Sequence, residues 1–139
     1  MHGAAIALYQ QALAIQPTFW PANRNLAYLY YAHGNFPEAA RYFALSCSNG
    51  PEDGDQFAHL GMALLEMGRL EQAEKAARAA LLVRPQGKTY HLILGKVLME
   101  ERKLPEARRE IETELSADPQ NAQAQALLNE VMRKMQALP

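Results

Sequence analysis

Proline recurs at equal intervals along this chain, at Pro17, Pro51, Pro85 and Pro119. The interval, about 34 residues, is typical of one supersecondary unit that has been copied and stacked. Each copy leaves an apolar face bare, and its neighbours bury that face, so the chain forms a linear array. No other feature of the sequence constrains the fold as strongly.

Other residue types recur at the same interval as the prolines, and we call each set of equivalent positions a column. Leucine occupies one of them, at Leu26, Leu60, Leu94 and Leu128. A small residue that follows an expected turn occupies another, at Ala5, Ala39, Ala73 and Ala107. Because different residue types share the spacing of the prolines, we interpret the prolines as part of a structural repeat rather than as a coincidence.

Each repeat reads as two helices joined by a short turn. In the first full unit, Gly34 ends the first helix, because glycine tolerates the left-handed conformation just past a helix end. Pro37 is accommodated in the first turn of the second helix, and Pro51 stops that helix because it has no amide hydrogen. Gly68 takes the turn position in the second unit, whereas the third unit has Arg102 there. If Arg102 keeps the glycine conformation, it carries about 1 kcal/mol of strain; a different turn is the alternative.

These columns resemble the tetratricopeptide repeat (TPR), whose motif places an aromatic residue, Leu, a small residue, Tyr, Gly, Ala, an aromatic residue and Pro in order. The first full unit carries Leu26, Ala27, Tyr30, Gly34, Ala39, Phe43 and Pro51. The second carries Phe57, Leu60, Gly61, Gly68, Ala73, Ala80 and Pro85. The third has Leu94, Gly95, Ala107 and Pro119, but departs from the motif at His91 and Glu114. The resemblance covers nearly the whole chain and implies an all-α superhelix, or solenoid, of three full helix pairs.

We expect one domain, residues 1–139, with a half unit at each end. The expected segments are an orphan second helix at 4–17, repeats at 20–53, 54–87 and 88–121, and a capping helix at 122–137. The last helix has one apolar and one polar face, which is typical of a cap. The first has apolar residues on all sides, so we expect its edge to dock further chain or to mediate self-association into a homo-oligomer.

Composition argues against several classes of partner. Lys and Arg number 14 against 15 for Asp and Glu, without a basic cluster, so we expect no nucleic acid. No apolar run approaches the roughly 20 residues that span a bilayer, so we expect no direct membrane insertion. The start of the chain does not read as a signal peptide, although a signal or anchor could precede it in a longer protein. The single cysteine, Cys47, excludes an intrachain disulfide, and we interpret it as a buried residue of a cytoplasmic protein.

The resemblance implies that a protein or peptide partner binds in a concave groove lined by the first helix of each pair. The inward-facing columns hold Arg24, Tyr28 and Tyr31, then Asp55, Ala58, Met62 and Leu65, and then Thr89, Leu92, Lys96 and Met99. Tyrosine supplies contact area at low entropic cost, and methionine adapts to irregular surfaces. The groove is therefore expected to favour an apolar or aromatic segment, with Arg24 and Lys96 able to pair an acidic group. Alternatively, Tyr28, Tyr31 and Met62 merely pack against adjacent helices.

Some TPR proteins clamp a terminal carboxylate with lysine, asparagine and arginine side chains. Of the matching positions in this sequence, only Arg24 carries a comparable residue. We therefore expect no carboxylate clamp.

No pattern in the sequence indicates catalysis. The histidines lack the spacing to other ligands that a zinc site needs, and the glycines form no phosphate-binding loop. The expected function is a non-catalytic scaffold or adaptor without a cofactor or metal. Two alternatives remain open. The chain could be the partner-recruiting segment of a larger enzyme or envelope-assembly protein, or a self-association module that uses its N-terminal helix.

Overall fold

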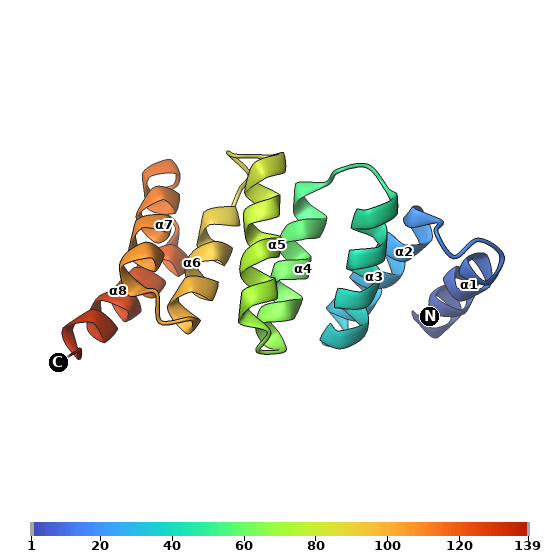
Figure 1. Cartoon of the computed structure of the whole chain (residues 1–139), viewed down its shortest axis with the longest axis horizontal. Coiled ribbons are helices and arrows are strands. Elements are labelled where there is room, and N and C mark those ends of the chain that lie inside the picture. Colours follow the sequence, from blue (N-terminus) through green and yellow to red (C-terminus); the bar gives the residue numbers. More distant parts are fainter. Residues whose placement is uncertain (1, 139) are drawn as a thin grey trace.

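The computed structural model describes residues 2–138, and over these residues it contains eight helices and no strand. The helices are α1 (His2–Ile15), α2 (Trp20–Ala32), α3 (Phe36–Asn49), α4 (Gly54–Glu66), α5 (Leu70–Val83), α6 (Tyr90–Glu100), α7 (Leu104–Ala117) and α8 (Ala122–Gln136). They stack in chain order from one end of the molecule to the other (Figure 1). The all-α repeat superhelix predicted from the sequence period is confirmed.

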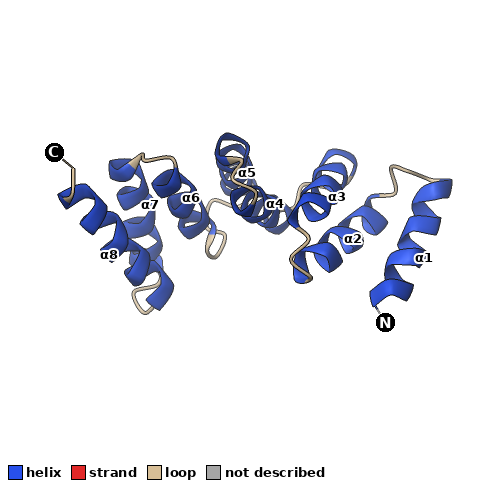
Figure 2. Cartoon of the chain, turned by 90° about the horizontal axis from the view of Figure 1, so that it is seen from below, coloured by secondary structure: helices blue, strands red, loops and turns tan. Residues whose placement is uncertain are grey.

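The stack is an arch with two layers. Figure 2 shows α2, α4 and α6 on the inner side of the arch and α3, α5 and α7 on the outer side, with α8 continuing the inner layer. Each helix contacts its neighbours in the chain, and α4 also contacts α6, as α6 contacts α8. The inner layer is thus a continuous surface made of the first helix of each pair.

Small residues bring the two helices of each pair together. Ala39, Ala73 and Ala107 are 0% exposed at equivalent positions of α3, α5 and α7. A Cβ atom built on Gly95 of α6 would lie 2.7 Å from Cγ1 of Ile111 on α7. The spacing of these helix pairs therefore depends on side chains no larger than the ones present.

The three turns within the pairs share one backbone shape. Gly34 and Gly68 both have φ of +74°, and Arg102 has φ of 65°. The amide of Arg102 donates to the carbonyl of Met99 at 3.0 Å, as the amide of Gly34 does to Tyr31. Arg102 therefore keeps the strained, left-handed conformation of the glycines, and the alternative of a different turn is not adopted.

Helix α6 begins one residue after the position expected from the sequence. The periodicity predicts a helix from about Thr89, but Thr89 itself is left-handed, with φ of 72°, and α6 starts at Tyr90. The Tyr90 ring lies against Gly54 and Gly87, where an added Cβ would come within 2.7 Å and 2.1 Å of ring or hydroxyl atoms. Its hydroxyl donates to the Asp55 carboxylate. This contact between α4 and α6 is formed across repeats and leaves no local signature.

Burial is uneven along the array. The core around α6 includes Leu94 and Leu98, both 0% exposed. At the C-terminal end, α8 still buries Val131 completely. At the other end, α1 buries no residue, and Leu8 and Ile15 are 64% and 88% exposed.

Candidate partner-binding surface

The inner layer gathers aromatic side chains from two repeats. The imidazole of His59 on α4 lies edge-on to Tyr28 and Tyr31 of α2, with ring centroids 5.1 Å and 5.2 Å away. Phe43 of α3 lies behind them, 4.9 Å from Tyr28. The Tyr31 hydroxyl donates to the sulfur of Met62 at 3.5 Å. We call Tyr28, Tyr31, His59 and Met62 the aromatic cluster.

Packing between helices accounts for part of the surface of the two tyrosines. Tyr28 and Tyr31 pack against α3 and α4, yet both remain half-buried rather than fully enclosed. His59 was not among the predicted groove residues, although it lies one turn after Asp55 on the same inner helix. Its Nδ1 lies 2.7 Å from the carbonyl of Asp55, so Nδ1 is the ring nitrogen that donates to this carbonyl.

The phenols stay neutral at physiological pH. Burial raises the pKa of Tyr28 to about 12, and the nearby carboxylates of Asp53 and Asp55 add to the effect. Burial, followed by the charge of Glu66, also raises the pKa of Tyr31. The cluster is therefore an uncharged aromatic surface with carboxylates at its edges.

Two predicted charged residues make contacts within the array. The guanidinium of Arg24 lies 5.2 Å from the centroid of the Trp20 ring, and its Nε donates to Asn25 at 3.3 Å. The carboxylate of Asp55 accepts from Tyr90, with Arg84 3.9 Å away. Asp55 therefore helps to join α4 to α6.

Two predicted groove residues lie in the core instead. Ala58 and Leu92, which stand one period apart, are each 3% exposed. Successive inner helices contact one another directly, α4 with α6 and α6 with α8, and these contacts cover that column. Ala58 and Leu92 therefore offer almost no surface to a partner. Thr89 is half-buried. It is the left-handed residue that precedes α6, and it takes no part in the aromatic cluster.

The remaining predicted residues meet at a second place. A hollow of about 490 Å³ lies between α4, α6 and α8, and its apolar lining includes Leu65, Met99 and Leu127. Its charged lining residues are Glu66, Lys96, Glu100 and Glu130. Three carboxylates against one ammonium group leave this site negative. We call it the acidic hollow.

The groove residues predicted from the sequence do not include Glu66, Glu100 and Glu130, although these glutamates occupy positions related by the repeat period. Glu66 and Glu100 stand one period apart, and Glu130 stands one period after Lys96 in the column of Met62. Interpreting the last helix as a cap left Glu130 out. The structure shows α8 contacting α6, so α8 extends the inner surface.

Other chemistry is sparse in the described part of the chain. Within residues 2–138, no three His, Cys, Asp or Glu side chains are grouped as metal ligands. Burial, followed by the charge of Asp53, raises the pKa of Cys47 to about 11, so this thiol stays protonated at neutral pH. None of the described helices combines the length and the hydropathy needed to cross a membrane.

Family models agree with this geometry. Two models, both described as tetratricopeptide repeat, match residues 59–128 and residues 1–60. The chain belongs to the tetratricopeptide repeat family. TPR domains are in general protein-interaction modules, and this chain carries their fold over the whole of its described length.

Solved TPR structures superpose well on the chain. YrrB, described as a TPR protein with an unusual peptide-binding site, is 22% identical with a TM-score of 0.89, over 97% of this chain and 70% of that one. MamA is 17% identical with a TM-score of 0.90, over 96% of this chain and 78% of that one. The second TPR domain of human RPAP3, solved with an HSP70 peptide, is 23% identical with a TM-score of 0.75, over 79% and 92%. These identities show the fold alone. No curated protein matches the sequence.

Proposed function

We propose that this TPR chain is a scaffold that binds a peptide or helix of a partner protein on its inner face. The observation that carries the proposal is the aromatic cluster. Tyr28, Tyr31 and His59 form a preorganised ring surface that is still half accessible, next to the sulfur of Met62. Rigid aromatic groups of this kind are enriched at the energetic centres of protein interfaces.

The charges refine the chemistry of the partner. The sequence suggested that Arg24 and Lys96 pair an acidic group, but Arg24 lies over Trp20, and Lys96 shares the acidic hollow with three glutamates. An apolar or aromatic residue followed by a lysine or arginine would match the cluster and the hollow together. The partner segment is thus expected to be basic rather than acidic.

The peptide complex of the RPAP3 domain supports peptide binding as the class of function, because that domain shares the fold. Its ligand is not carried over to this chain. A clamp for a carboxylate needs several cations, and Arg24 is the one plausible match that the sequence offers at those positions.

The experiment combines partner capture with charge reversal. The wild-type chain is used to isolate partners from its native source, and the bound segment of one partner is then measured by titration. Glu66→Lys with Glu100→Lys reverses the hollow, and we expect binding to weaken about tenfold or more. Glu52→Lys with Glu112→Lys, both at exposed positions, is the matched control. Equal affinity of both variants would refute the contact between the partner and the acidic hollow.

A second candidate function is self-association through α1. The observation in its favour is the exposure of Leu8 and Ile15 on a helix that buries none of its residues. An exposed apolar face of this kind is typical of an interaction site.

A further inference from the structure

The repeat provides an internal comparison on the outer face of the arch. In the described chain an inner helix lies between two successive outer helices three times: α2 between α1 and α3, α4 between α3 and α5, and α6 between α5 and α7. Because the repeats are in register, the residues at these three places can be compared position by position, one period apart.

The middle groove is open and apolar. It forms a hollow of about 570 Å³ whose walls are alanines of α3 and α5 and whose floor is α4. The alanines are Ala40, Ala44, Ala76 and Ala79, and the floor residues are Phe57, Leu60 and Leu64. Ala40 and Ala76 are 7% and 6% exposed at the bottom of this hollow, whereas Ala44 is exposed on α3 and Ala79 is half-buried on α5.

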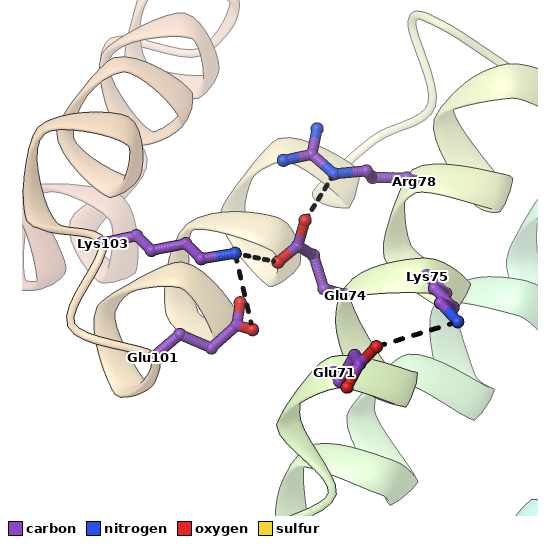
Figure 3. Close-up of polar contacts among 6 residues, drawn as sticks. All are labelled: Glu71, Glu74, Lys75, Arg78, Glu101 and Lys103. Carbon is purple, nitrogen blue, oxygen red and sulfur yellow. Dashed lines mark hydrogen bonds and ion pairs between the residues drawn. The ribbon is translucent and has the colours of Figure 1, made fainter.

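The groove between α5 and α7 is bridged by charged side chains (Figure 3). Nζ of Lys103 lies 2.9 Å from Glu74, and Nε of Arg78 lies 2.8 Å from the other oxygen of that carboxylate. On the same side, Nδ1 of His91 lies 2.6 Å from Glu110. These side chains span from α5 to the turn before α7 and from α6 to α7.

The equivalent positions show why the middle groove is open. Ala40 corresponds to Glu74, Ala44 to Arg78 and Ala76 to Glu110, in each case one period apart.

In the preceding repeat, the position equivalent to Ala76 is Tyr42. The Tyr42 ring is stacked on Tyr30, with ring centroids 5.7 Å apart. At the equivalent positions, both neighbouring repeats thus carry larger side chains that contact other side chains of the chain itself. The middle groove keeps alanine at these positions.

The rim of the middle groove is positive. Arg41, Arg69 and Lys75 line it, and no carboxylate does. Arg41 and Lys75 do reach glutamates on their own helices, Glu38 at 3.6 Å and Glu71 at 3.9 Å. These pairs are exposed and intrahelical, so they compete weakly with an incoming partner.

We propose that the outer groove between α3 and α5 docks a short amphipathic helix of a partner protein, with a small apolar face and carboxylates along its flanks. Alanine walls allow the backbone of such a helix to approach closely, and Arg41, Arg69 and Lys75 face its acidic flanks. Helix α1 of a second copy fits less well, because it is apolar but carries no carboxylate to meet the rim. This surface lies on the opposite side of the arch from the inner face and does not depend on the function proposed above.

The test uses two designed peptides and the whole chain. Both peptides form a helix with an alanine and leucine face, one flanked by glutamate and the other by lysine. We expect the glutamate peptide to bind about tenfold more tightly, or better, than the lysine peptide, as followed by fluorescence anisotropy. In amide NMR spectra of the labelled chain, the shifted signals should lie at residues 40–44 and 69–79. Absence of binding by the glutamate peptide up to about 1 mM would overturn the proposal.

Substitutions in the groove test where the peptide binds and which charges attract it. Ala44→Arg introduces the residue found at the equivalent position 78. It is expected to weaken the binding of the glutamate peptide about tenfold. Ser48→Arg, exposed on the same helix outside the groove, is the matched control. Arg69→Glu with Lys75→Glu should reverse the preference and let the lysine peptide bind more tightly.

Three further outcomes would contradict the proposal: equal binding of the two peptides, an Ala44→Arg variant that binds like Ser48→Arg, and groove signals that shift with protein concentration alone. The last would assign the groove to a second copy. The Glu66→Lys with Glu100→Lys variant should bind the glutamate peptide as the wild type does, so failure here is distinct from failure of the inner-face proposal.

Discussion

At the scale of single residues, Arg102 stands in a conformation that the other repeats reserve for glycine. Its φ of 65° matches the turn at Gly34 and Gly68. Arg102→Gly removes the clash of Cβ with the backbone, and part of that gain is offset by the entropy of glycine in the unfolded chain. We expect the free energy of unfolding to rise by about 0.5–1 kcal/mol. Urea denaturation measures it.

The control for this substitution is Arg102→Ala. It removes the same charge but keeps Cβ, so it should leave the stability close to that of the wild type. A gain of equal size in both variants would mean that the arginine side chain, and not its backbone conformation, is destabilising.

Also at the residue scale, Glu101 makes the stability depend on pH. Burial, and then the neighbouring Glu74, raise its pKa from 4.5 to about 7. Hydrogen bonds with the Glu101 carboxyl, Arg78 and Lys103 lower the pKa of Glu74 to about 2. One oxygen of Glu101 is buried without a hydrogen-bond partner, and a proton there would turn it into a donor.

The two shifts act in different pH ranges. Because the folded pKa of Glu101 lies above the unfolded one, the contribution of Glu101 to stability is fully present below about 4.5 and is lost as the pH rises to about 7. The contribution of Glu74 is lost only as the pH falls from 4.5 towards 2. We expect the melting temperature of Glu101→Gln to fall less between pH 5 and pH 8 than that of the wild type. Glu100→Gln, its exposed neighbour, should follow the wild type, and a parallel decline in all three chains would contradict the assignment.

At the scale of the elements, helix pairs are held at a distance set by small side chains. Ala73 is 0% exposed, and a Cβ on Gly61 would already lie 3.4 Å from the Ala73 carbonyl. Ala73→Leu should overpack α4 against α5 and cost about 1–3 kcal/mol. Thermal melts measure the loss, with Gln72→Leu on the exposed side of the same helix as control. A melting temperature equal to that of the wild type would show that the pair can separate without cost.

The elements themselves were largely readable from the sequence, because their signals are local. Gly34 and Gly68 marked turns by their backbone freedom, and Pro51 marked a helix end by its missing amide hydrogen. The start of α6 was predicted to within one residue, but the packing that fixes it was not. Its position depends on Tyr90 packing between Gly54 and Gly87, and Gly54 belongs to the preceding repeat.

At the scale of the whole molecule, the apolar surface of α1 bears on assembly. If Leu8 and Ile15 mediate self-association, the sedimentation coefficient of the wild type should rise with concentration, and Leu8→Gln with Ile15→Gln should abolish the rise. Leu82→Gln is the matched control, because Leu82 is 83% exposed on α5. A wild type that sediments as a monomer at every concentration would exclude this candidate function.

Across the molecule, the period by itself determined the kind of fold, the order of the helices and the face on which a partner was sought. Those properties follow from local backbone preferences and from side chains that recur once in every repeat. The tertiary structure decided which residues of that face are available. Contacts between successive inner helices buried Ala58 and Leu92, gathered Tyr28 and Tyr31 around His59, and placed glutamates of three helices in one hollow. Exposure depends on how tightly neighbouring repeats approach, and that distance is set by side chains far apart in the sequence.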